Sequence, residues 1–138
     1  MNITEIPLEQ LTHKIIGAAV EVHSTLGPGL LESVYQECLT LELRRSQLNV
    51  ERERHVPLKY KGELIESQLK LDLLVEGRVI VEVKAVESLH PIHQAQVVTY
   101  LKLTGCPAGL LMNFNSIVLK SGLKRLHRPD LYVKKIFS

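Results

Sequence analysis

One stretch of this chain, residues 71–84, reads Leu71-Asp72-Leu73-Leu74-Val75-Glu76-Gly77-Arg78-Val79-Ile80-Val81-Glu82-Val83-Lys84. Two apolar segments rich in Val, Leu and Ile flank Glu76-Gly77-Arg78, which is typical of a short turn, so the stretch predicts a β-hairpin. Asp72, Glu82 and Lys84 interrupt these segments. Charged side chains are almost never fully buried without a partner or a metal, so packing alone does not explain them.

The alternation of side chains along a strand predicts where these charges lie. A three-residue loop centred on Gly77 pairs residue 75 with residue 79, and therefore Asp72 with Glu82. A two-residue loop would instead place Asp72 opposite Val81, on the wrong face. With the longer loop, Asp72, Glu82 and Lys84 share one face. The other face is expected to enter the core; it comprises Leu69, Leu71, Leu73, Val75, Val79, Val81 and Val83.

Two directly opposed carboxylates predict a metal site. Their Cβ atoms would lie roughly 4.5–5.5 Å apart, and the charges would repel each other unless a cation bridged them. Oxygen ligands of this kind suit Mg²⁺ or Mn²⁺. The alternative is that Asp72, Glu82 and Lys84 are solvated charges on the polar outer face of a hairpin.

Length and composition limit the classes of protein. The 138 residues predict a single domain over residues 1–138 with a sizeable core. No apolar run approaches the roughly 18–20 residues of a membrane span, so no membrane partner is expected. The N-terminus lacks a basic segment followed by an apolar one, which argues against a secretory signal. Cys38 and Cys106 have apolar neighbours, which predicts buried free thiols and a cytoplasmic protein.

The net charge of +2 is unevenly distributed. Residues 120–138 contain six Lys and Arg residues against one acid, Asp130, a net charge of +5. A basic segment of this kind can contact phosphates, although a solvated surface is the common alternative. The candidate nucleic-acid contacts in it are Lys120, Lys124, Arg125 and Arg128. A second basic group, residues 44–54, is interrupted by Glu51 and Glu53.

The remaining pattern predicts the order helix, helix, three antiparallel strands, helix, strand. Apolar residues at helical spacing indicate helices over residues 8–25 and 30–47, separated by Gly27-Pro28-Gly29. Pro91 and Gly105 suit the two ends of a third helix over residues 91–104. The expected strands span residues 49–60, 66–76, 78–86 and 108–113, with a further short strand at 116–120. Pro57 indicates an edge position or a bulge in the first of them. Layers of this kind predict an α/β or α+β fold.

These residues carry a resemblance. Gly29-Leu30-Leu31-Glu32-Ser33-Val34-Tyr35 matches the pattern G-x-x-E-x-x-Y. Together with Asp72, Glu82-x-Lys84 and Gln96, in that order, it makes the chain resemble the GxxExxY proteins, a branch of the PD-(D/E)XK nuclease superfamily, over about residues 8–128. The resemblance implies an α/β, restriction-endonuclease-like mixed sheet flanked by helices. It also implies phosphodiester cleavage that depends on a divalent metal.

The resemblance and the chemistry of the side chains together suggest roles. Asp72 and Glu82 would bind Mg²⁺ or Mn²⁺, helped by the backbone carbonyl of Val83. Glu32, in the first turn of the second helix, is favoured there by the helix dipole and would reach the metal directly or through water. The alternative for Glu32 is an ordinary acid at a helix start.

Lys84 and Gln96 complete the expected catalytic set. Lys84 would orient or deprotonate the attacking water, or stabilise the charged transition state; its alternative is an ion pair with Asp72 or Glu82. Gln96 would hydrogen-bond near Lys84 or the water, with a surface glutamine as the alternative. The hydroxyls of Tyr35 and Tyr100 are further candidates, expected at the site rim. The pair His90 and His93 is also a candidate, although a plain role at the helix start is favoured for it.

We therefore expect a Mg²⁺-dependent nuclease acting on nucleic acid, with DNA as the favoured substrate. The alternative from another class is a non-catalytic nucleic-acid-binding or protein-interaction module that retains the fold. Hydrolysis of a small phosphodiester is a third reading. The sequence leaves the oligomeric state open, a homo-oligomer included.

Overall fold

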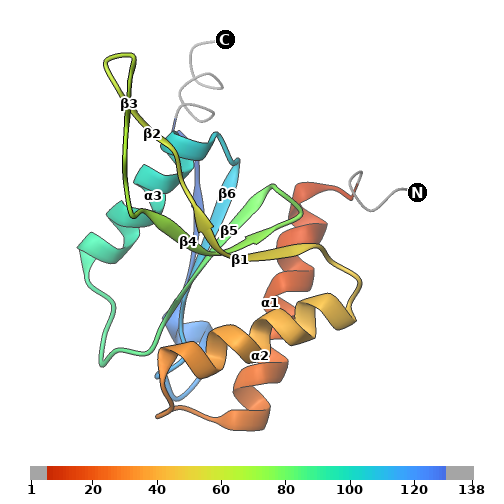
Figure 1. Cartoon of the computed structure of the whole chain (residues 1–138). Helices are drawn as coiled ribbons and strands as arrows, with labels where there is room; N and C mark the ends of the chain where they lie inside the picture. The colour runs from red at the N-terminus through yellow and green to blue at the C-terminus, as the bar shows by residue number, and fades with distance from the viewer. Residues whose placement is uncertain (1–5, 130–138) are drawn as a thin grey trace.

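The computed structural model describes residues 6–129 (Figure 1). Two helices come first, α1 (Leu8–Leu26) and α2 (Glu32–Arg45). Five strands follow, then the helix α3 (Pro91–Thr104), a sixth strand, the 3₁₀ turn η2 (Leu119–Gly122) and a last strand. The strands are β1 (Val50–His55), β2 (Leu58–Tyr60), β3 (Glu63–Ile65), β4 (Lys70–Val75), β5 (Val79–Lys84), β6 (Ala108–Asn113) and β7 (Leu123–His127).

Five strands form one mixed sheet in the order β1-β4-β5-β6-β7. Its neighbours are antiparallel except β5 and β6, which are parallel. A parallel pair needs a crossover connection, and α3 supplies it. Figure 1 shows α1 and α2 on one side of the sheet and α3 on the other. The expected α/β, restriction-endonuclease-like arrangement is therefore present, and the three antiparallel strands expected before α3 are β1, β4 and β5.

The hairpin register follows the longer-loop prediction. Val75 pairs with Val79, and Leu73 pairs with Val81. Glu76 and Gly77 both have positive φ angles, 53° and 65°, as a tight hairpin turn requires. The register directs Val81 and Val83 to one face, and it brings Asp72 towards Glu82.

The two faces of the sheet are covered by separate hydrophobic clusters. The first joins α1 and α2 to the sheet and includes Leu39, Leu73, Val81 and Leu110. The second joins α3 to the opposite face and includes Ile80, Val97, Leu101 and Leu111. Because both faces of the sheet are packed, the three central strands, β4, β5 and β6, consist mostly of apolar residues. This burial on both faces is why β5 and β6 are almost wholly buried.

One expected facing was wrong. Leu71 packs in the cluster under α3 and not with Leu73, and Leu69 packs beside it. The reason lies between two pairs of the β1–β4 ladder, Arg52 with Leu73 and Arg54 with Leu71. Glu53, between them, has a positive φ of 51° and no ladder partner. The regular alternation of side chains is broken there. Residues on the two sides of Glu53 in β1, and of Asp72 in β4, therefore do not keep to the faces of the sheet that alternation predicts.

Other differences concern element boundaries. The strand expected over residues 49–60 is divided at Val56-Pro57. Its second part pairs with β3 as a separate two-stranded hairpin that extends beyond the main sheet (Figure 1). The first part, β1, is an edge strand, as Pro57 indicated. The strand expected over residues 116–120 is wrong: the chain makes the η2 turn there, and the strand comes later, as β7.

Three other expectations can be checked. Cys38 and Cys106 are free thiols; Cys106 is buried and Cys38 is partly buried. No helix in the described part of the chain is long and apolar enough to cross a membrane. The basic segment 120–138 is described only as far as residue 129, so Lys134 and Lys135 lie outside the described residues.

Candidate active site

The backbone hydrogen bonds between β4 and β5 stop at the Leu73–Val81 pair. Beyond it, two carboxylates accept the backbone N–H groups. The backbone N–H of Asp72 donates to Oε2 of Glu82 at 2.9 Å. The backbone N–H of Val83 donates to Oδ2 of Asp72 at 2.8 Å. The strands therefore fork at this point, and each acid is fixed by a hydrogen bond to the opposite strand.

Each carboxylate keeps one oxygen unused. Oδ1 of Asp72 and Oε1 of Glu82 accept no hydrogen bond from the described residues. Asp72 is half-buried, and Glu82 is only 3% exposed. Two partly desolvated carboxylates whose free oxygens lie in one fork form an arrangement that a cation would stabilise.

The electrostatics of the fork agree with this. Burial, followed by the charge of Asp72, raises the pKa of Glu82 from 4.5 to about 8. Burial also raises the pKa of Asp72 from 3.8 to about 6, against a lowering by its hydrogen bond from Val83. Without a cation the pair therefore tends to hold a proton near neutral pH. Clustered acids with raised pKa values are characteristic of functional sites.

Lys84 ends β5, two residues from Glu82, and is partly buried. Its positive charge lowers the pKa of both Asp72 and Glu82, so the ammonium group lies within electrostatic range of the fork. Among residues 6–129 it nevertheless makes no ion pair within 4.0 Å. The alternative reading of Lys84 as a direct ion-pair partner is therefore not observed, and the ammonium group remains available to another anion.

Glu32 lies at the start of α2, within electrostatic range of the fork. It is the first residue of that helix and is exposed to solvent. Its charge raises the pKa of both Asp72 and Glu82, so the structure brings the three acids into one region. One helical turn later, Gln36 is buried, and its Nε2 donates to the backbone carbonyl of Asp72 at 3.2 Å. The start of α2 is thereby held against β4.

Gln96, on α3, hydrogen-bonds to Tyr100 of the same helix. Its Nε2 donates to the hydroxyl of Tyr100 at 3.1 Å, and Tyr100 is largely buried. The pKa of Tyr100 is raised by burial and then by the charges of Glu82 and Asp72, so the phenol borders the fork. Tyr100 is therefore buried within electrostatic range of the fork, and Gln96 lies one hydrogen bond away from it.

Tyr35 is a correction. It is fully buried and is not at the rim: its hydroxyl donates to the carbonyl of Gly27 at 2.6 Å and accepts the N–H of Leu30 at 3.0 Å. Its ring stacks on Phe114 at 4.8 Å. The tyrosine of the G-x-x-E-x-x-Y pattern therefore fixes the turn that precedes Glu32 and acts on the site only through that turn.

His90 and His93 contact each other at the start of α3. The backbone N–H of His90 donates to Nδ1 of His93 at 2.9 Å. This is the helix-start role that the sequence favoured.

The four basic candidates near the C-terminal end lie over separate surfaces. Lys124 lines a polar pocket with Ser88 and Ser121, next to the segment that follows Lys84. Arg125, the next residue, lines another pocket with Glu9 and His13. Lys120 lines a third, beside α1, and Arg128 donates through Nη1 to the carbonyl of Gly105 at 2.5 Å. The structure therefore does not gather them beside the carboxylates.

Sequence reasoning missed Gln36 and Glu53. Glu53 lies opposite Asp72, and its charge raises the pKa of Asp72. From the sequence, Glu53 was interpreted only as an interruption of a basic group, because a left-handed backbone conformation at one residue produces no sequence pattern. Gln36 lies four residues after Glu32, on the same face of α2. That spacing was the signal that could have found it.

The donor set fits a divalent cation with few protein ligands. Among residues 6–129 no three acid, histidine or cysteine side chains are close enough to form a ready-made site. Mg²⁺ commonly takes only one or two carboxylates and keeps several waters. The unused oxygens of Asp72 and Glu82 suit that mode, and they leave Glu32 to act through water.

The combination defined here is a mixed sheet with helices on both faces, whose central hairpin forks around two acids with a lysine two residues from the second. A family model for the PD-(D/E)XK nuclease superfamily matches residues 9–126. The chain therefore belongs to the PD-(D/E)XK nuclease superfamily, and it is a nuclease-like protein. No curated protein and no solved structure matches it significantly.

Proposed function

We propose that the protein is a divalent-metal-dependent nuclease that hydrolyses phosphodiester bonds of nucleic acid, with DNA as the first candidate. The proposal is carried by the two carboxylate oxygens in the fork and by the Lys84 ammonium beside them, which have no hydrogen-bond or ion-pair partner among residues 6–129. Membership of the superfamily supports the same chemistry. The closer relationship to the GxxExxY branch remains part of the proposal.

Asp72 and Glu82 would hold Mg²⁺ or Mn²⁺ through Oδ1 and Oε1, with the carbonyl of Val83 as a further ligand. Such an ion, when bound, makes a coordinated water more acidic and offsets negative charge on the phosphoryl group. The hydrogen bonds to Asp72 and Val83 keep both carboxylates oriented before any ligand arrives. Glu32 would orient a water bound at the fork.

Lys84 would act on the reacting group. Its ammonium, which makes no ion pair within residues 6–129, would hold the attacking water or stabilise negative charge that develops on the phosphate. Gln96 would keep the Tyr100 hydroxyl directed at the rim, where it can donate to the water or to a phosphate oxygen. Neither Gln96 nor Tyr100 supplies a carboxylate ligand.

The proposal extends to organisation and location. The chain would act as a single domain, and its free thiols Cys38 and Cys106 suit the reducing cytoplasm. Lys120, Lys124, Arg125 and Arg128 are proposed as nucleic-acid contacts. Lys124 is the best placed of these, because it borders the segment that leaves Lys84.

The test is a cleavage assay with single- and double-stranded DNA and RNA, using wild-type protein and Glu82→Gln. We expect cleavage with Mg²⁺ or Mn²⁺, and none with EDTA or in Glu82→Gln. Cleavage that persists equally in Glu82→Gln would indicate a contaminating nuclease. Binding of nucleic acid without cleavage of any polymer would favour the non-catalytic module.

A further inference from the structure

A buried glutamine connects the fork to the edge strand. Gln36 is 6% exposed, and its Nε2 donates to the carbonyl of Asp72 at 3.2 Å. Its other amide atom, Oε1, accepts Nη2 of Arg52 at 3.4 Å. One side chain of α2 thus contacts both β4 and β1. The nuclease chemistry of Asp72 and Glu82 makes no use of the contact with Arg52.

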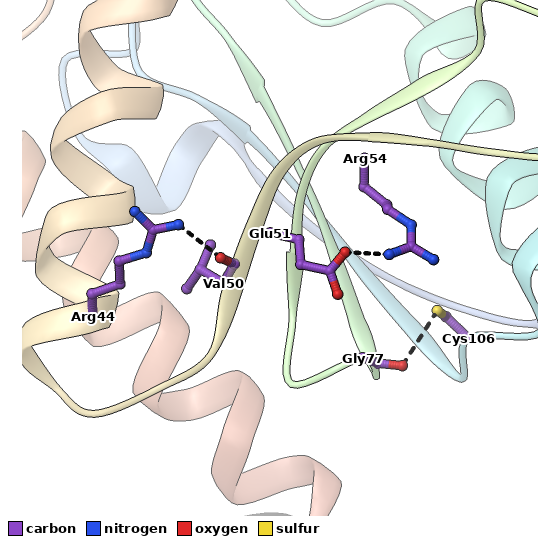
Figure 2. A network of polar contacts seen from close by, with 6 residues as sticks. All are labelled: Arg44, Val50, Glu51, Arg54, Gly77 and Cys106. Atoms are coloured by element: carbon purple, nitrogen blue, oxygen red, sulfur yellow. Dashed lines mark hydrogen bonds and ion pairs between the residues drawn. The ribbon is translucent and has the colours of Figure 1, made fainter.

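Arg52 has most of its hydrogen-bonding capacity unused. A guanidinium group carries five N–H donors, and Gln36 occupies one of them. Within the described part of the chain Arg52 has no ion pair, although Glu51 and Glu53 adjoin it in the sequence. Of these two acids, Glu51 is instead paired with Arg54, as Figure 2 shows.

The change of face at Glu53 separates the two arginines. Val50 packs under α1 and α2, and Arg52, two residues later, contacts Gln36 on that same side. After Glu53, Val56 packs in the cluster under α3. Arg54 therefore does not continue the face of Arg52, and it turns back to Glu51 (Figure 2).

The position of Arg52 suits contact with a substrate beside the fork. Arg52 pairs with Leu73, the residue after Asp72, and paired strands lie roughly 4.8 Å apart. Through this pairing Arg52 lies one strand away from the residue next to Asp72, on the side of the sheet where it contacts Gln36.

We infer that Arg52 is a substrate-binding residue that holds a backbone phosphate adjacent to the scissile one, and that Gln36 is the residue that positions it. The inference rests on the proposed nuclease function and names a contact that this function requires. Arginine suits the role because its planar group binds a phosphate through two parallel N–H donors. The bond to Gln36, at 3.4 Å, occupies one of the five N–H donors, and no other residue within 6–129 accepts from the group, so two donors can bind a phosphate while Gln36 keeps its contact.

The experiment compares Arg52→Ala with Arg54→Ala, an arginine two residues away on the same strand. Fluorescein-labelled single- and double-stranded DNA oligonucleotides serve as probes, with Mn²⁺. Cleavage gives kcat and KM, and binding is measured in a Lys84→Ala background across a range of salt concentrations. Arg52→Ala should raise KM and Kd about tenfold, which corresponds to about 1.4 kcal/mol of lost binding energy, with kcat nearly unchanged. Its salt slope should fall by about 0.7–0.9.

Further variants separate positioning from folding. Arg52→Lys keeps the charge but loses the planar group, so it should keep the salt slope and lose part of the affinity. Gln36→Met should raise KM in the wild-type background and add little in the Arg52→Ala background, because the two residues would act as a unit. Circular dichroism checks the fold, and Arg52→Lys decides the matter if Gln36→Met does not fold.

Each outcome decides the inference. Equal KM and salt slope for wild type, Arg52→Ala and Arg54→Ala would overturn it, even if cleavage is normal. If wild-type protein cuts nothing, the proposed function fails while the binding measurement still judges Arg52. Selective loss of binding in Arg52→Ala would then support the phosphate contact, and absence of any binding would overturn it.

Discussion

The carboxylate of Glu82 accepts the backbone N–H of Asp72, and the carboxylate of Asp72 accepts an N–H from the strand of Glu82. These two bonds, of 2.9 and 2.8 Å, replace the backbone ladder where β4 and β5 separate. They satisfy N–H groups that the fork would otherwise leave unpaired. The hydrogen bonds that complete the hairpin therefore also fix two like charges close together.

The burial of Glu82, followed by the closeness of Asp72, predicts a pH-dependent stability in the absence of metal. The pKa of Glu82 is raised from 4.5 to about 8. A folded-state pKa above the unfolded value means that the folded protein keeps a proton that the unfolded chain has released. The stabilisation is complete below pH 4.5 and is lost as the pH rises through about 8. The free energy of unfolding in EDTA should fall across that window, as urea denaturation at a series of pH values can measure.

Glu82→Gln is the control for that measurement, because the amide stays neutral throughout. Its free energy of unfolding should vary less with pH than that of wild type. Mn²⁺ should stabilise wild type most at the alkaline end, where protons no longer compete for the carboxylates. An unchanged pH dependence in Glu82→Gln would show that the coupled acids do not control it.

The second prediction concerns metal affinity. Asp72→Asn retains an oxygen that can accept the N–H of Val83, so the fold should survive while a charged ligand is lost. Mn²⁺ affinity measured by calorimetry should fall at least about 100-fold, since even partners outside the ligand set are worth 10–100-fold. Glu87→Gln, an exposed acid three residues after Lys84, should have no effect. Equal Mn²⁺ affinity in wild type and Asp72→Asn would contradict the assignment.

The third prediction concerns the turn before Glu32. Tyr35→Phe removes the hydroxyl that bonds Gly27 and Leu30 but keeps the stacking on Phe114. We expect a loss of about 1–3 kcal/mol in the free energy of unfolding. Tyr60→Phe is the matched change at a tyrosine that is 62% exposed, and it should cost less than about 0.5 kcal/mol. Similar losses in the two variants would remove the structural role given to Tyr35.

The fourth prediction separates two neighbouring cations. Lys124 lines the polar pocket beside the segment after Lys84, whereas Arg125 lines a pocket with Glu9 and His13. Lys124→Ala should weaken nucleic-acid binding and reduce its salt slope by about 0.7–0.9, with the chemical step nearly unchanged. Arg125→Ala should have the smaller effect. The reverse order in fluorescence-anisotropy titrations would place the nucleic acid on the other surface.

Much of the fold and of the fork could be predicted because strand periodicity is a local property. The Gly77 turn allowed two loop lengths, and the structure has the longer one: Val75 pairs with Val79, and Asp72 is directed towards Glu82. Pro91 and Gly105 marked both ends of α3 correctly. In each case the deciding residues lie within a few positions of the feature that they specify.

The features that the sequence did not reveal depend on tertiary contacts or on an unusual backbone angle. The left-handed conformation of Glu53 moves Leu71 to the opposite face, and nothing in an Arg-Glu-Arg triplet indicates it. The link from Gln36 to Asp72 joins residues 36 positions apart. Tyr35 was misplaced because its partners belong to a turn whose path the pattern does not define.

The most direct test of metal-assisted hydrolysis at the fork is the effect of Lys84→Ala on cleavage and on Mn²⁺ binding, measured on the same preparations. Lys84 borders the carboxylates but supplies no oxygen ligand. We predict that cleavage of the DNA and RNA panel falls by about 10²–10³, while the Mn²⁺ affinity is largely retained and nucleic-acid binding weakens only slightly. The account would be contradicted if Lys84→Ala cut as fast as wild type, or if wild-type protein bound nucleic acid with Mn²⁺ and cut no member of the panel.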